Sequence, residues 1–139
     1  MIYPDNLEHK IGFDIVRKTL ASKCSNPLGK AECESMTFSN NYKLIVNSLS
    51  QTNEYLSIIK STNDFPNGSI FDLRESLLKI KAAGSFLTET ELYQLGKTLV
   101  SATEICDYFT EEKSAAYPLL KQIADSLLCF PEISRHIDS

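Results

Sequence analysis

The side chains of this sequence that could take part in chemistry are few, and their spacing forms no recognisable catalytic pattern. The two histidines, His9 and His136, lie near opposite ends of the chain, each in a polar stretch. A metal site needs further ligands, and no Cys, Asp or Glu spacing supplies them around either histidine. We therefore interpret both histidines as surface residues.

Acid catalysis and nucleotide binding are not supported either. Carboxylate pairs occur at expected helix ends, which are exposed and give no reason for the raised pKa of a catalytic acid. These carboxylates are Glu89, Glu91, Glu111 and Glu112. The stretch 26–30 (NPLGK) has a Gly-Lys pair but lacks the first glycine and the preceding strand of a phosphate-binding loop. The sequence therefore predicts no catalytic, cofactor-binding or metal-binding residue.

The four cysteines form no Cys-x-x-Cys pair and fall inside predicted helices or at their ends. They are Cys24, Cys33, Cys106 and Cys129. This arrangement indicates neither a zinc knuckle nor a disulfide scaffold. We interpret them as small buried hydrophobic residues in a reducing cytoplasm.

Basic residues gather in the first part of the chain and could form a weak patch that faces phosphate. They are Arg17, Lys18, Lys23 and Lys30. The alternative is a solvated helix face, because no aromatic residue lies among them to stack on bases. The formal net charge of −4 and the pI of about 5.2 give no overall attraction to nucleic acid.

Length and composition are those of one globular domain over residues 1–139. Hydrophobic residues make up 42% and charged residues 23% of the chain, which argues against disorder. No apolar run approaches the roughly 20 residues that span a bilayer, and the N-terminus lacks the pattern of a secretion signal. We expect a cytoplasmic protein that makes no contact with a membrane.

The first third of the sequence predicts a helical hairpin. One helix is expected from residue 13 or 14 to about 24, after an interruption at Gly12. A second helix starts at Pro27, with Asn26 as its N-cap, and carries Met36 near its end. Because the turn between them is short, the two helices must reverse direction and pack together.

Two long helices organise the rest of the chain. The first covers residues 41–60, with three candidate caps at 39–41, and its apolar seam is Tyr42, Ile45, Leu49, Thr52, Leu56 and Ile59. The second opens with a capping box at Thr88 and Glu91, and its seam is Leu92, Leu95, Leu99, Ala102, Cys106 and Phe109. Seams matched in length predict that these helices pack together at a shallow angle, and Gly96 suggests a backbone packed closely against the second one.

Shorter helices are expected at 72–83, at 117–128 and from Pro131 onward, and the longest break lies at 61–68. Glu104, Asp107, Glu111 and Glu112 would close the second long helix, against the preference of the helix dipole. The expected fold is all-α, an antiparallel bundle of about six to seven helices, two of them long.

Several phrases, read together, carry a family resemblance over nearly the whole chain. They are LEHKIGF at 7–13, NPLGK at 26–30, I-x-x-x-L-x-x-T-x-E at 45–54, IFDLRESL at 70–77, FLTxxEL at 86–92 and YPLL at 117–120. In order and spacing they resemble the N-terminal segment of a bacterial MutS-like protein of the second type, the recombination-suppressing branch of the DNA mismatch repair MutS superfamily.

This resemblance implies an all-helical core and lever region ahead of an ATPase domain, often with a C-terminal nuclease-type Smr domain. The parent is expected to be a homodimer that binds ATP, magnesium and branched DNA or, in some members, collided ribosomes. The motifs for these activities would lie beyond Ser139, so no functional residue is carried onto this chain. The expected function is thus a structural segment of a DNA-acting ATPase. The alternative is a free-standing helical module that recruits a partner protein through an exposed groove.

Overall fold

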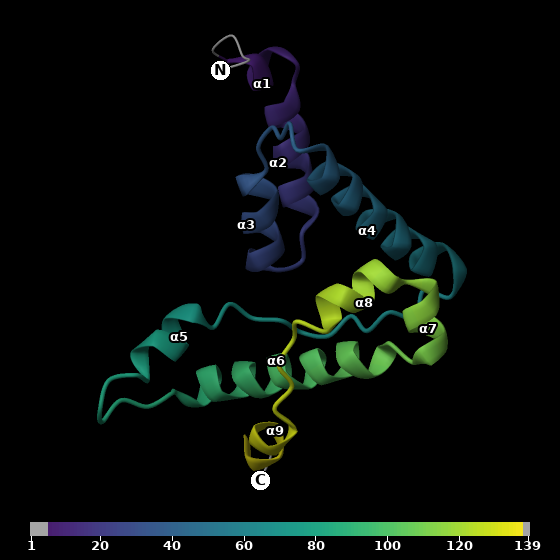
Figure 1. Cartoon of the computed structure of the whole chain (residues 1–139). Helices are drawn as coiled ribbons and strands as arrows, with labels where there is room; N and C mark the ends of the chain where they lie inside the picture. The colour runs from purple at the N-terminus through teal and green to yellow at the C-terminus, as the bar shows by residue number, and fades with distance from the viewer. Residues whose placement is uncertain (1–5, 138–139) are drawn as a thin grey trace. The chain divides into compact units, whose positions relative to one another are not determined.

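The computed structural model describes residues 6–137, and these residues form α-helices and no strand (Figure 1). The predicted all-α class is confirmed. The chain divides after Phe38 into two compact units, which are described separately. Among residues 6–137, no helix combines the length and the hydropathy that a membrane-spanning segment needs.

The first unit is a helical hairpin with a short helix before it. It consists of α1 (Leu7–Lys10), α2 (Phe13–Lys23) and α3 (Pro27–Ser35). Helix α3 begins where the sequence predicted, because the side chain of Asn26 accepts a hydrogen bond from the backbone N–H of Gly29 and Pro27 occupies the first helical position. Helices α2 and α3 pack against each other, as a short turn requires.

The second unit contains two helices of 20 residues and four short ones. They are α4 (Tyr42–Ser61), α5 (Arg74–Lys79), α6 (Glu89–Tyr108), α7 (Glu111–Ala116), α8 (Pro118–Ala124) and α9 (Pro131–Ile137). Of the three candidate caps for α4, Asn41 is the one whose side chain accepts from the N–H of Leu44. Thr88 and Glu91 form the predicted capping box of α6.

The core of the second unit is an aromatic cluster at the C-terminal ends of α4 and α6. Ile58, Tyr108, Phe109 and Ala124 are buried, and Phe65 packs against them. The ring of Phe65 meets those of Tyr55, Tyr108 and Phe109 edge to face, with centroids 5.4, 5.1 and 6.4 Å away. Phe65 belongs to the predicted break between α4 and α5, so this irregular segment supplies the centre of the core.

The expected pairing of α4 with α6 along their seams is wrong. Helix α4 packs against α8, and α6 packs against α9. The segment between α4 and α5 runs along α6 instead (Figure 1): the N–H of Phe71 donates to the hydroxyl of Thr98, and the hydroxyl of Ser101 donates to the carbonyl of Ser69. This segment and α9 pack along α6, and the aromatic cluster is where Ile58 of α4 and Tyr108 of α6 come together.

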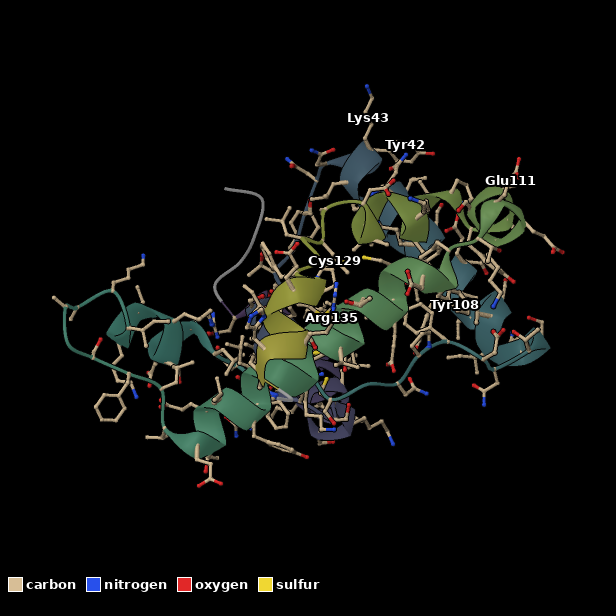
Figure 2. The ribbon with its side chains drawn as sticks, turned by 90° about the horizontal axis from the view of Figure 1, so that it is seen from below. Tyr42, Lys43, Tyr108, Glu111, Cys129 and Arg135 are labelled. Atoms are coloured by element: carbon tan, nitrogen blue, oxygen red, sulfur yellow. The ribbon has the colours of Figure 1, made fainter. Side chains whose placement is uncertain are left out.

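The seam predicted for α4 is exposed and not buried. The one buried residue of α4 is Ile58, which is fully covered and lies off the seam. We call the exposed residues the α4 stripe: Tyr42, Ile45, Leu49, Leu56 and Ile59. Tyr42 and Leu49 are 78% and 64% exposed, and Tyr42 and Lys43 project from the start of the helix in Figure 2.

The described residues form nine helices, whereas the sequence predicted six to seven. The ends of several short helices also differ from the prediction. Thr110 caps a separate helix, α7, so Glu111 and Glu112 lie in a first turn, which the helix dipole favours, and do not close α6. Helix α8 ends at Ala124 and leaves Leu128 exposed. Helix α5 ends at Lys79, although Gly84 has the expected left-handed backbone with φ of 80°.

Two glycines mark close packing against α6. A Cβ atom on Gly96 would lie 3.1 Å from Cγ2 of Ile137, so a side chain of α9, and not a backbone as expected, covers that position. A Cβ atom on Gly68 would lie 2.0 Å from the hydroxyl of Ser101. The segment before α5 can approach α6 this closely only because residue 68 has no side chain.

Candidate functional site

The basic residues of the first unit lie partly around one open cavity. Its volume is about 420 Å³. Its charged lining comprises Arg17, Lys18, Lys30, Asp14 and Glu34. The structure thus brings together three of the four predicted basic residues, whereas Lys23 is not part of this lining.

Acidic neighbours already engage two of the three cations of this cavity. Arg17 donates to the carboxylate of Glu8 at 2.5 Å, and its guanidinium lies 5.1 Å from the ring centre of Phe13. The Lys30 ammonium lies 3.9 Å from the Glu34 carboxylate. An incoming phosphate would have to displace these partners, so the cavity is a poor phosphate site.

Asp14 and His9 form a further pair in this unit. His9 Nδ1 lies 3.0 Å from Asp14 Oδ2, and this hydrogen bond lowers the pKa of Asp14. His9 is exposed, as the sequence interpretation expected. A carboxylate with a lowered pKa remains ionised, so the pair stabilises the start of α2 and does not provide a catalytic acid.

In the second unit, Asp64 connects the break after α4 to the end of α6 and to α7. It accepts from the Lys113 ammonium at 2.5 Å, the Thr62 hydroxyl at 2.5 Å and the Tyr108 hydroxyl at 2.9 Å. The hydrogen bond from Lys113 is the main cause that holds the pKa of Asp64 well below its usual range. Figure 2 shows Tyr108 at the end of α6, close to the turn of α7 that carries Glu111. With three donors engaged, this carboxylate acts as a structural connection.

Glu91 has a similar role at the start of α6. Its carboxylate accepts from the Lys79 ammonium at 2.6 Å, from the Ser76 hydroxyl at 2.8 Å and from the N–H of Thr88 at 2.7 Å. These hydrogen bonds, that from Lys79 first, lower its pKa to about 2. The carboxylate holds α5 against the first turn of α6.

Glu54 caps a helix that lies far from it in sequence. Its carboxylate accepts from the backbone N–H groups of Leu119 and Leu120, at 3.1 and 2.9 Å. These donors belong to the first turn of α8, which has no side-chain cap from its own flanking residue. Sequence reasoning missed this contact because the partner is 65 residues away.

The four cysteines are free thiols of intermediate exposure, and each lies next to another. The sulfur atoms of Cys24 and Cys33 are 3.5 Å apart, and those of Cys106 and Cys129 are 2.8 Å apart. The cysteines therefore lie in two pairs, although the sequence has no Cys-x-x-Cys motif that would have predicted them. The first could have been found by placing Cys24 and Cys33 on the predicted hairpin.

The carboxylates of Asp64, Glu91 and Glu54 hold helices together. Within residues 6–137, no cluster of three or more His, Cys, Asp or Glu side chains could hold a metal ion. The Gly29-Lys30 pair lies in the first turns of α3, where Asn26 already takes the N–H of Gly29.

Comparison with known proteins finds similarity to one group of proteins. The chain is 27% identical over 132 residues to "Endonuclease MutS2" of Geobacillus sp. (strain WCH70), a match that covers 94% of this chain and 17% of the relative. It is 25% identical to the proteins of the same name from Alkaliphilus oremlandii (strain OhILAs) and from Halalkalibacterium halodurans, over 86% and 90% of this chain. These matches cover 15% and 16% of the two relatives.

The chain thus spans about one sixth of the length of the curated relatives it matches. No family model matches the chain, and no solved structure matches it. The similarity supports a MutS2-like segment.

Proposed function

We propose that this chain is a non-catalytic helical core and lever segment of a MutS2-like protein, which acts in recombination control or DNA repair. The observation that carries the proposal is the match of nearly the whole chain to one part of several MutS2 proteins. We place the segment at the N-terminal side of the parent's ATPase domain, as the sequence resemblance implies.

Contacts within the second unit support a structural role. Glu54 ends the phrase at 45–54 and Leu119 and Leu120 lie in the phrase at 117–120, and hydrogen bonds join these two stretches. The 20-residue helices α4 and α6 are long enough, at 1.5 Å per residue, to reach about 30 Å each. Helices of this length, tied by carboxylate caps, are suited to passing a rigid-body motion between distant domains.

The chemistry of the parent lies outside this chain in our proposal. ATP and magnesium would bind in the ATPase domain, and an endonuclease domain would act on DNA. The parent would be a cytoplasmic homodimer that binds branched DNA or, in some members, the ribosome. This chain alone would bind DNA weakly or not at all, since its basic residues are partly neutralised by Glu8 and Glu34.

A chimera tests the lever role. The aligned segment of the Geobacillus relative is replaced by this chain, and ATP hydrolysis is measured with and without four-way junction DNA. A lever segment is expected to preserve stimulation of hydrolysis by DNA. A chimera that folds and hydrolyses ATP at the basal rate, yet no longer responds to DNA, would contradict the proposal. The matched control is the Geobacillus relative with its own segment, into which only the junction residues of the chimera are introduced.

A second candidate is a free-standing helical interaction module, which the α4 stripe favours. Its exposed apolar side chains could receive an amphipathic helix of a partner protein. In a lever segment the same stripe would be covered by other helices of the parent. Polar substitution of Leu49 and Leu56 in the chimera separates the two, because only the lever proposal predicts a loss of stability of the parent.

A further inference from the structure

Cys106 and Cys129 face each other across two elements of the second unit. Cys106 lies in the last turns of α6, and Cys129 lies between α8 and α9, labelled in Figure 2. Their sulfur atoms are 2.8 Å apart, although 23 positions separate them in sequence. A disulfide has a sulfur to sulfur distance of about 2.05 Å, so the atoms need to approach by only about 0.8 Å.

A backbone carbonyl group lies beside each of the two thiols. Cys129 Sγ lies 3.9 Å from the carbonyl oxygen of Ala102, which is one turn before Cys106 on α6. Cys106 Sγ lies 4.0 Å from the carbonyl oxygen of Ala124, the last residue of α8. Cys129 thus lies beside α6, which carries Cys106, and Cys106 lies beside the end of α8, after which the chain continues to Cys129. Both residues have intermediate exposure, so a small oxidant can reach them.

The pair in the first unit provides an internal comparison. Cys24 and Cys33 are 3.5 Å apart, so closure would require movement by about 1.5 Å. Cys24 also lies 3.4 Å from the carbonyl of Leu20 in its own helix. Closing this pair requires the larger movement of sulfur, so it should oxidise less readily than the pair in the second unit.

We propose that Cys106 and Cys129 are a reversible oxidative modification site, at which a disulfide links α6 to the segment that follows α8. The oxidant is a low-molecular-weight disulfide such as glutathione disulfide. The thiolate of one cysteine attacks it, forms a mixed disulfide and releases one glutathione thiolate. The second cysteine, deprotonated by solvent, then attacks the protein sulfur and releases the other. The protein loses two protons and two electrons, and two glutathione molecules are formed.

The disulfide would constrain α7 and α8. Both helices lie within the loop that it closes, and Ala124 of α8 belongs to the aromatic core. Closing such a loop removes freedom from the unfolded chain and stabilises the folded one.

The hydrogen bond with Cys129, followed by burial, raises the pKa of Cys106 to about 11. Cys106 is thus mostly a thiol at neutral pH, and the site should respond slowly. The site is independent of the proposed function.

The test is disulfide mapping of the full chain in glutathione buffers of graded GSSG to GSH ratio. Remaining thiols are alkylated, the chain is digested without reductant, and linked peptides are identified by mass spectrometry. We expect the Cys106–Cys129 peptide to appear at a GSSG to GSH ratio about tenfold lower than the Cys24–Cys33 peptide. Oxidation should raise the melting temperature by roughly 10 °C.

Single variants and a matched double variant complete the test. After oxidation, C106S and C129S should each carry one glutathione adduct on the remaining cysteine and show no rise in melting temperature. C24S/C33S should show the same rise in melting temperature as the wild-type chain. The proposal is overturned if the wild-type chain forms no Cys106–Cys129 peptide, if the Cys24–Cys33 peptide forms first, or if C24S/C33S abolishes the rise. The wild-type mapping decides the outcome even if a serine variant fails to fold.

Discussion

The carboxylate of Glu54 accepts a 2.9 Å hydrogen bond from the backbone N–H of Leu120, 66 residues further along the chain. It also takes the N–H of Leu119. A residue of α4 thereby caps α8, and the cap acts between elements that sequence patterns treat as separate. This connection is the basis of the first prediction.

Glu54→Ala should lower the free energy of unfolding by about 1–2 kcal/mol, because two helical N–H groups lose their acceptor. Glu54→Gln keeps one acceptor oxygen and should lose about half as much. Urea unfolding followed by circular dichroism measures both. Glu104→Ala is the control, since the Glu104 side chain is exposed and makes no hydrogen bond or ion pair within residues 6–137. Equal losses for Glu54→Ala and Glu104→Ala would rule out the cap.

Phe65→Ala should cost about 2–4 kcal/mol, because Phe65 is the ring on which Tyr55, Tyr108 and Phe109 converge. Phe86→Ala removes the same atoms from a side chain that is 75% exposed and should cost under about 0.5 kcal/mol. Thermal or urea unfolding compares the two. A small loss for Phe65→Ala would place the core elsewhere.

Two glycine substitutions should act in opposite directions. Gly68→Ala places a methyl group 2.0 Å from Ser101 Oγ and 2.5 Å from its Cβ, so it should destabilise the chain by about 1–3 kcal/mol. Gly29→Ala meets only ordinary contacts of 3.6 Å or more in α3 and should stabilise by up to about 1 kcal/mol. If Gly68→Ala leaves the unfolding midpoint unchanged or raises it, the close approach of residue 68 to α6 is wrong.

Acid should destabilise the second unit through Glu91. Its folded pKa of about 2 is below the usual value of 4.5 for a glutamate carboxyl, so its contribution to stability is complete above about pH 4.5 and disappears as the pH falls toward 2. The lowered pKa of Asp64 acts in the same direction. Urea midpoints between pH 7 and pH 2.5 measure this, and Glu91→Gln should flatten the decline.

Glu89→Gln provides the control for the acid experiment. Glu89 starts the same helix, but its carboxylate contacts no partner within the described residues. This variant should therefore keep the wild-type decline. The assignment to Glu91 fails if Glu89→Gln flattens the profile as strongly as Glu91→Gln.

Local signals in the sequence predicted the beginnings of helices well. Asn26, Asn41 and Thr88 each cap the helix that follows, because these caps involve atoms only three residues apart. The all-α class was predicted from the spacing of apolar residues at alternating steps of three and four. The basic hairpin was also found, although the pairing of Arg17 with Glu8 was not.

The tertiary arrangement could not be predicted from periodicity alone. The residues of the α4 stripe follow the apolar periodicity of the helix, yet they are exposed, and the residue of α4 that the core buries is Ile58. Which face of α4 is covered depends on Phe65 and on Glu54, whose partners come from distant segments. The Cys106–Cys129 pair was missed for the same reason, since the spacing of these two cysteines has meaning only after α7 and α8 fold back.

We propose that the chain is a scaffold with no DNA site of its own. Fluorescence anisotropy of labelled four-way junction DNA, titrated with the full chain at about 150 mM salt, tests it most directly. We predict no saturable binding below about 10 μM, and no difference between the wild-type chain and an Arg17→Ala/Lys30→Ala variant. Sub-micromolar binding that weakens steeply with added salt and is lost in that variant would contradict the claim.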